Sequence, residues 1–123
     1  MAKRVLVVED DAYVRDYLSA ALETSGQGLE VSTAPNGREA AERLAAGGTD
    51  LVLTDINMPE MNGVELVRHL RANHPTVQVV LMSGASADWL PELVREGLDD
   101  LPLLTKPVSV SQLLELIGRI LGQ

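Results

Sequence analysis

The sequence contains no cysteine and no phenylalanine, and its only aromatic residues are Tyr13, Tyr17 and Trp89. Without cysteine there can be no disulfide framework, no thiolate metal site and no thiol nucleophile. Sites for flavins or stacked nucleobases commonly use aromatic faces, so the shortage of aromatic side chains argues against both functions. The core must therefore be built from Leu, Val, Ile, Ala and Met.

Positive charge is also scarce, because 10 Lys and Arg residues face 18 Asp and Glu residues, for a net charge of −8. This balance argues against nucleic acid or an anionic membrane surface as a direct partner. The apolar runs are too short to insert into a bilayer, and the chain starts with a strand-like run rather than a signal peptide. With 123 residues, 46% of them hydrophobic, we expect one cytoplasmic domain that covers residues 1–123.

Apolar runs of strand length alternate with segments of helical period along the chain. The expected strands are Val5–Val8, Leu29–Thr33, Leu51–Leu53, Val77–Met82 and Leu101–Leu104. Apolar residues at helical spacing predict helices that include Val14–Leu22, Gly37–Leu44, Leu66–Leu70, Trp89–Val94 and Val110–Leu121. Asp11 is the expected N-cap of the first of these helices.

Strands that alternate with helices are typical of a mostly parallel sheet covered on both faces. The first, third and fourth strand candidates are apolar throughout, as buried central strands are. The second alternates between apolar and polar residues and the fifth contains Pro102, so both are expected at the edges of the sheet. These features predict the flavodoxin-like, doubly wound (βα)5 three-layer α/β sandwich with strand order 2-1-3-4-5.

Polar residues stand where four of the five strand candidates end. These residues are Glu9 and Asp10, Asp55, Ser83 and Lys106. In open parallel sheets ligands bind at the carboxyl ends of the strands, so we expect these side chains to converge. Three neighbouring carboxylates repel one another unless protons or a cation compensate, and an all-oxygen ligand set favours Mg²⁺.

This set of residues suits phosphoryl transfer to a carboxylate. Asp55 would attack phosphorus and form an aspartyl phosphate. Mg²⁺ would be held by Asp10 and Asp55, with Glu9 helping through water, while Lys106 and Ser83 would contact the remaining phosphoryl oxygens.

Four stretches of the sequence together resemble the receiver domain of bacterial two-component response regulators. They are Val5–Asp11 (VLVVEDD), Thr54–Gly63 (TDINMPEMNG), Met82–Ala85 (MSGA) and Thr105–Pro107 (TKP). The resemblance implies that Asp55 is a phosphoacceptor supplied by a sensor histidine kinase or a histidine phosphotransfer protein. It also implies that the backbone carbonyl of Asn57 is a Mg²⁺ ligand and that the Lys106–Pro107 peptide bond is cis.

By the same resemblance the protein is a signalling phosphoacceptor in a phosphorelay. It would catalyse only its own phosphorylation and dephosphorylation, and it would pass the signal to a downstream effector protein. The domain could stand alone or belong to a hybrid sensor kinase. Two positions depart from the family pattern: Leu103 replaces the usual Tyr or Phe three residues before Lys106, and Val108 replaces a common Phe. The usual aromatic route of signal output is therefore in question, whereas the acceptor chemistry is not.

Three other functions are alternatives to a phosphorylated receiver. A receiver-like module recognised without phosphorylation could lose its carboxylates, yet all of them are present. A Mg²⁺-dependent phosphatase of the aspartyl-phosphate kind needs a general-acid Asp where this chain has Asn57, and a flavodoxin-like redox carrier lacks its aromatic stack. Taken singly, Asp55 and Ser83 could be ordinary turn or cap residues and Lys106 a solvated lysine, so the interpretation depends on their convergence.

Overall fold

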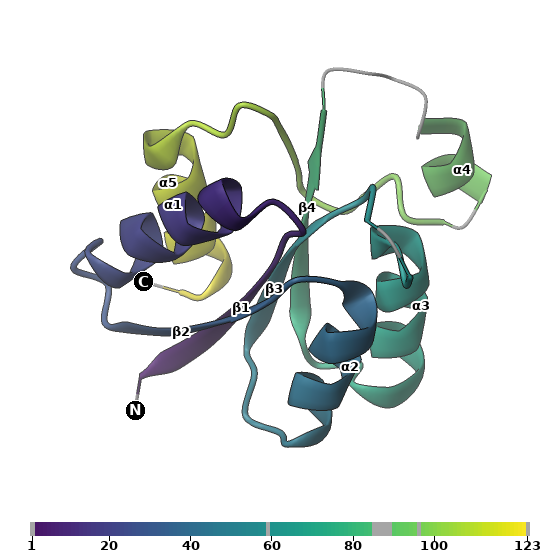
Figure 1. The fold of residues 1–123 in the computed structure, drawn as a ribbon, viewed down its shortest axis with the longest axis horizontal. Helices are drawn as coiled ribbons and strands as arrows, with labels where there is room; N and C mark the ends of the chain where they lie inside the picture. Colours follow the sequence, from purple (N-terminus) through teal and green to yellow (C-terminus); the bar gives the residue numbers. More distant parts are fainter. Residues whose placement is uncertain (1, 59, 85–89, 96, 123) are drawn as a thin grey trace.

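The computed structural model describes residues 2–58, 60–84, 90–95 and 97–122, and Figure 1 shows the course of the chain. Strands and helices alternate from β1 to α5. The strands are β1 (Lys3–Val8), β2 (Leu29–Ala34), β3 (Leu51–Asp55), β4 (Gln78–Ser83) and β5 (Leu103–Thr105). The helices are α1 (Ala12–Glu23), α2 (Gly37–Ala45), α3 (Gly63–Asn73), α4 (Leu90–Arg95) and α5 (Val110–Ile120). Three residues of the predicted motifs and of the fourth predicted helix lie outside the described residues: Pro59, Ala85 and Trp89.

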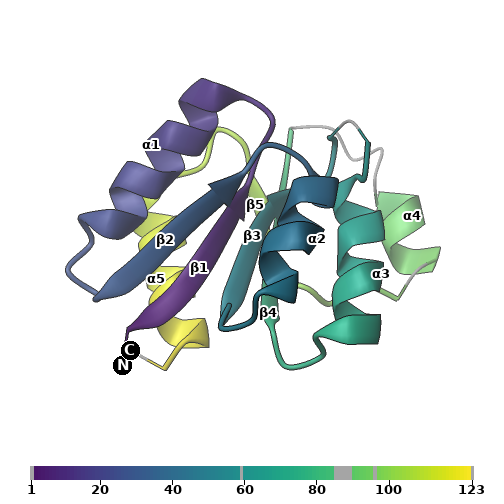
Figure 2. The same cartoon turned by 60° about the horizontal axis from the view of Figure 1, so that its bottom comes forward.

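The five strands form one parallel sheet in the order β2-β1-β3-β4-β5. Helices α1 and α5 cover one face, and α2, α3 and α4 cover the other (Figure 2). The predicted fold class and strand order are therefore confirmed. Because all strands run in the same direction, their carboxyl ends lie along one edge of the sheet.

The sheet separates two apolar layers, and β1 contributes to both because successive side chains of a strand point to opposite faces. Leu6 and Val8 pack with side chains of α2, α3 and α4. Val5 and Val7 pack with side chains of α1 and α5. All five residues of β3 are buried, as expected for a central strand.

Both edge strands differ from the central ones, although one reason for the prediction needs correction. β2 alternates between half-buried and exposed residues until Ala34, in agreement with its sequence pattern. β5 begins at Leu103 and not at Leu101, so Pro102 precedes the strand and does not lie within it. Pro102 has no N–H to donate, but its carbonyl oxygen accepts a hydrogen bond from the N–H of Leu81 at 2.8 Å.

Two helix starts place backbone close to the carboxyl ends of the strands. Asp11 caps α1 as predicted, and its Oδ1 accepts hydrogen bonds from the N–H groups of Tyr13 (2.9 Å) and Val14 (3.3 Å). Helix α3 begins at Gly63, where a Cβ would lie 2.5 Å from the backbone oxygen of Asp55. Glycine at this position therefore lets α3 start directly against the end of β3.

Candidate functional site

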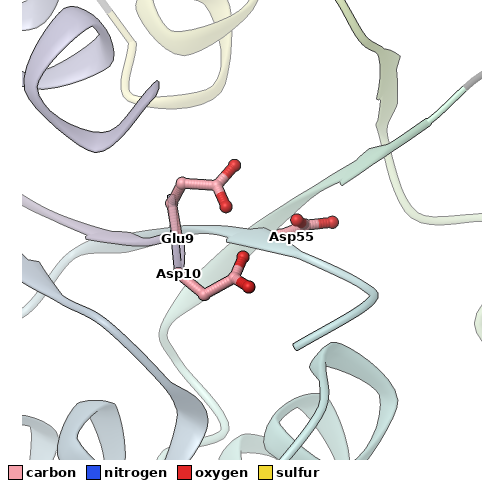
Figure 3. A group of neighbouring side chains, drawn as sticks. All are labelled: Glu9, Asp10 and Asp55. Carbon is pink, nitrogen blue, oxygen red and sulfur yellow. The ribbon is translucent and has the colours of Figure 1, made fainter. Parts of the chain in front are cut away.

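Three acidic side chains meet at the carboxyl ends of β1 and β3. Glu9 and Asp10 directly follow β1, and Asp55 is the last residue of β3. One carboxylate oxygen from each residue lies within 4.8 Å of the others, and Figure 3 shows the three side chains at neighbouring strand ends. Glu9 is fully buried and Asp55 is 6% exposed, whereas Asp10 is exposed to solvent. The predicted convergence of these three residues is therefore present.

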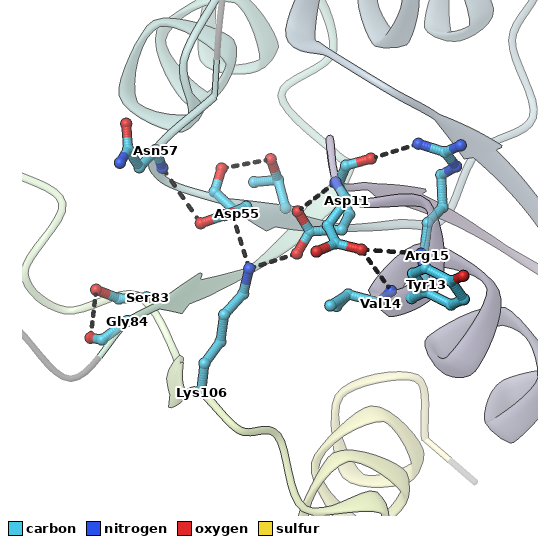
Figure 4. Close-up of polar contacts among 11 residues, drawn as sticks. Asp11, Tyr13, Val14, Arg15, Asp55, Asn57, Ser83, Gly84 and Lys106 are labelled. Atoms are coloured by element: carbon cyan, nitrogen blue, oxygen red, sulfur yellow. Dashed lines mark hydrogen bonds and ion pairs between the residues drawn. The ribbon is translucent and has the colours of Figure 1, made fainter.

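Lys106 forms ion pairs with two of these three carboxylates. Its Nζ lies 2.8 Å from Oδ2 of Asp55 and also forms an ion pair with Oε1 of Glu9 (Figure 4). The residue follows β5, and its N–H donates to the Ser83 carbonyl at 2.7 Å, which ties its backbone to the end of β4. The peptide bond to Pro107 is cis, as the resemblance implied.

Backbone N–H groups hold the two buried carboxylates in place. Oδ1 of Asp55 accepts from the N–H of Asn57 at 3.2 Å, and Oε2 of Glu9 accepts from the N–H of Asp11 at 3.2 Å. In each buried carboxylate, one oxygen therefore accepts a hydrogen bond from the ammonium of Lys106. The other oxygen accepts one from the backbone N–H two residues further along the chain. This sharing fixes the direction of both groups.

The electrostatic environment favours a further cation. Burial, helped by the neighbouring carboxylates of Asp10 and Asp55, raises the pKa of Glu9 to about 6 against the opposing effect of Lys106. Burial lowers the pKa of Lys106, but its hydrogen bonds to Asp55 and Glu9 outweigh this effect and raise the pKa above its ordinary value. Lys106 is therefore a permanent cation at neutral pH. A single ammonium cannot neutralise three carboxylates, so the site carries an excess of negative charge.

The donor set fits a hard divalent cation. The cluster offers only carboxylate oxygens, and no cysteine is present in the chain. Mg²⁺ is bound through a small number of carboxylates and keeps several waters. The exposed Asp10 leaves one side of the cluster open to solvent, as such a hydrated ion requires.

Ser83 and Asn57 lie near the cluster but do not contribute side chains to it in this structure. Ser83 is buried at the end of β4, and its hydroxyl donates to the carbonyl of Gly84 at 3.1 Å. Asn57 has an exposed side chain, and its contact with the site is the backbone N–H that reaches Asp55. The expected role of its carbonyl as a metal ligand stays a prediction.

Arg15 also contacts the acidic segment after β1, although the sequence pattern gives no indication of it. Its Nη1 donates to the backbone carbonyl of Glu9 at 2.9 Å, which links the first turn of α1 to the acidic segment. The contact depends on how α1 leaves β1. An arginine among the polar residues of an amphipathic helix gives no sequence signal for such a contact.

The position that departs from the expected aromatic pattern lies on the surface. Leu103 is 46% exposed at the start of β5, while Val108 is nearly buried in the layer beneath α1 and α5. The first residue of β5 is therefore an exposed aliphatic side chain, at the position where the family pattern has an aromatic one.

A parallel sheet of this order, with buried carboxylates and a lysine at its carboxyl edge, defines a flavodoxin-like α/β domain with a candidate cation site. The family model for the response regulator receiver domain matches residues 5–118, so the chain belongs to this family. In the part of the chain that the structure describes, no helix is long and apolar enough to cross a membrane.

Relatives and solved structures agree with this assignment. The response regulator receiver protein CpdR of Brucella abortus is 37% identical over 120 residues, which cover 97% of each chain. The DNA-binding transcriptional regulator NtrC of Escherichia coli is 35% identical over 119 residues, and the match spans 96% of this chain but only 24% of NtrC. The solved structure of the chemotaxis protein CheY4 of Vibrio cholerae has a TM-score of 0.82 at 27% identity, covering 98% of this chain and 99% of that one.

Proposed function

We propose that residues 1–123 form one receiver domain whose phosphoacceptor is Asp55. A carboxylate oxygen of Asp55 attacks the phosphorus of a phosphohistidine on a sensor kinase or a histidine phosphotransfer protein. The new O–P bond forms as the P–N bond breaks, and the imidazole keeps the bonding electron pair and takes up a proton. Hydrolysis of the acyl phosphate later restores the carboxylate.

The contacts of Asp55 support this role. Asp55 is almost fully buried but lies at the open end of β3, next to the exposed Asp10. The N–H of Asn57 and the ammonium of Lys106 hold its two oxygens in fixed directions. A nucleophile held in this way needs little reorientation before it attacks, which lowers the entropic part of the barrier.

Lys106 and Ser83 would stabilise the charge of the phosphoryl group. The Lys106 ammonium already lies beside the attacking carboxylate, so it can stay paired with an oxygen of the incoming group. The Ser83 hydroxyl would have to turn away from the Gly84 carbonyl to donate to a phosphoryl oxygen. A hydroxyl that exchanges one acceptor for another is well suited to sense whether the phosphoryl group is present.

Asp10, Asp55 and the backbone carbonyl of Asn57 would hold Mg²⁺, with Glu9 contributing through water. When bound, the ion would neutralise the carboxylates and the negative charge of the phosphoryl oxygens. The observation that carries this assignment is the cluster of Glu9, Asp10 and Asp55 within 4.8 Å, which has more negative charge than Lys106 compensates.

We place this signalling step in the cytoplasm, between a phosphorylated kinase or transfer protein and a downstream effector. The acidic net charge of −8 supports protein partners over direct binding to nucleic acid. CpdR matches over nearly its whole length and NtrC over about a quarter, so the family contains both arrangements of the domain. With Leu103 at the usual aromatic position, output would depend on rearrangement around Ser83 or on passing the phosphoryl group onward.

The test is phosphorylation by a small acyl phosphate with Mg²⁺, followed by intact-mass analysis. The protein should gain one phosphoryl group that survives acid and is removed by hydroxylamine. Asp55→Asn should gain none, whereas Asp99→Asn, at an exposed position before β5, should behave as the unaltered protein. An Asp55→Asn protein that still gains the group would refute the assignment, and an unaltered protein that gains none would support recognition without phosphorylation.

A further inference from the structure

Arg15 makes a contact that connects helix α1 to the acidic segment after β1. Its side chain is half-buried and its Nη1 donates to the carbonyl oxygen of Glu9 at 2.9 Å, along the dashed line that runs from Arg15 in Figure 4. This carbonyl belongs to the peptide group that joins Glu9 to Asp10. Arg15 therefore acts on backbone, not on a carboxylate.

The other polar groups on either side of Asp10 are also held. The N–H of Glu9 donates to the Ala34 carbonyl at 3.1 Å, and Oε2 of Glu9 accepts from the N–H of Asp11. Asp11 in turn caps α1 through Tyr13 and Val14. Among the hydrogen bonds that the structure shows for this segment, the one to the Glu9–Asp10 peptide plane comes from Arg15, which holds the carbonyl of that plane.

The orientation of that plane matters because Asp10 is exposed. Glu9 and Asp55 are fixed by burial and by Lys106, whereas Asp10 is exposed and does not contact Lys106 in the ion pairs that the structure shows, so the orientation of its backbone contributes more to where its carboxylate lies. A rotation of the preceding peptide would swing the Asp10 carboxylate away from Asp55. Mg²⁺ tolerates little deviation from octahedral geometry, so its affinity is sensitive to such a rotation.

We propose that Arg15 is a positioning residue that presents Asp10 to the divalent cation and thereby sets the Mg²⁺ affinity of the site. The inference rests on the proposed function, because it assumes that the acidic cluster binds Mg²⁺. Arg15 touches neither the ion nor the phosphoryl group, and its effect passes through the Glu9–Asp10 backbone. Groups that orient metal ligands are typically worth about 10-fold to 100-fold in affinity.

The experiment measures Mg²⁺ affinity by calorimetric titration of the full chain and of three variants. Arg15→Met removes the donor but keeps an extended side chain, and Arg15→Lys keeps one charged donor. Arg119→Met is the matched control, because Arg119 is an exposed arginine on α5 whose loss changes the net charge equally. Thermal unfolding in EDTA and phosphorylation rates at saturating Mg²⁺ are measured on the same proteins.

The expected result is a Mg²⁺ dissociation constant about tenfold higher in Arg15→Met, in line with the usual effect of a ligand-orienting group. Arg15→Lys should fall between this variant and the unaltered protein, and Arg119→Met should match the unaltered protein. In Arg15→Met the metal-free melting temperature should fall only modestly, through the loss of one hydrogen bond, and saturating Mg²⁺ should restore the phosphorylation rate to that of the unaltered protein.

Equal Mg²⁺ affinity in Arg15→Met and Arg119→Met would overturn the inference and leave the proposed function intact. A lower metal-free melting temperature together with a rate that saturating Mg²⁺ does not restore would also overturn it, because Arg15 would then be a purely structural residue. If the unaltered protein itself binds no Mg²⁺, the metal part of the proposed function fails, and the inference fails with it.

Discussion

The ammonium of Lys106 lies 2.8 Å from Oδ2 of Asp55 and also pairs with the fully buried Glu9. In the metal-free protein this one cation holds together two carboxylates that would otherwise repel each other. The same residue is expected to contact the phosphoryl group. Lys106 thus contributes both to the stability of the resting site and to the chemistry, and the two contributions can be measured separately.

Replacing Lys106 by methionine should destabilise the metal-free protein. The change leaves Glu9 buried without its cation, and we expect a loss of about 2 kcal/mol, below the usual cost of breaking a fully buried pair because the lysine is 25% exposed. Urea unfolding in EDTA measures this loss. The double variant Glu9→Gln with Lys106→Met should recover part of it, whereas equal stability of Lys106→Met and the unaltered protein would contradict the ion-pair account.

Mg²⁺ should raise the melting temperature of the unaltered protein. The ion binds the folded cluster and not the unfolded chain, so at tenfold excess over its dissociation constant it should add about 1.4 kcal/mol of stability. Asp10→Asn should lose most of this increase, and Asp99→Asn should keep it. An increase of the same size in Asp10→Asn would place the bound ion elsewhere.

The metal-free protein should lose stability between about pH 4.5 and pH 6 because of Glu9. The pKa of this group is about 6 in the folded protein against 4.5 for the free carboxyl, so the folded state holds its proton more tightly. Its contribution is therefore fully present below pH 4.5 and lost as the pH rises through 6. Glu9→Gln should remove this part of the pH dependence, measured as urea unfolding midpoints in EDTA. Identical pH profiles of the two proteins would show that the pKa of Glu9 is not raised.

Ser83→Ala should slow phosphorylation without weakening Mg²⁺ binding. The Ser83 hydroxyl donates to the Gly84 carbonyl and not to a carboxylate, so its removal leaves the metal ligands in place. The loss of one hydrogen bond to a charged phosphoryl oxygen should lower the rate about tenfold. Stopped-flow measurement with an acyl phosphate at saturating Mg²⁺ checks this, and an unchanged rate would remove Ser83 from the chemistry.

The sequence was sufficient to predict the strand order and the meeting of Glu9, Asp10 and Asp55. Two of the three central strands, β1 and β3, end at acidic residues, and because they are neighbours in a parallel sheet their ends lie side by side. The start of β5 was predicted two residues early, because an apolar Leu-Pro-Leu-Leu run does not reveal where the ladder begins.

Details of the site depend on side-chain geometry that spacing does not specify. The sequence placed Lys106 near a phosphoryl oxygen, but its pairing with the buried Glu9 follows from the path of the chain after β5. The Ser83 hydroxyl donates to the carbonyl of Gly84, an acceptor that the sequence does not reveal because a hydroxyl can turn to several partners. The Arg15 contact depends on how α1 packs against the end of β1, a tertiary relationship without a local signal.

The most direct test of the account is to locate the phosphorylated residue. The protein is phosphorylated with an acyl phosphate and Mg²⁺, reduced with borohydride and digested, and its peptides are sequenced by mass spectrometry. Reduction of an aspartyl phosphate gives homoserine, and we predict homoserine at position 55 alone. Homoserine at position 10, a reduced glutamate at position 9, or an unmodified peptide around Asp55 in a phosphorylated protein would contradict the central claim.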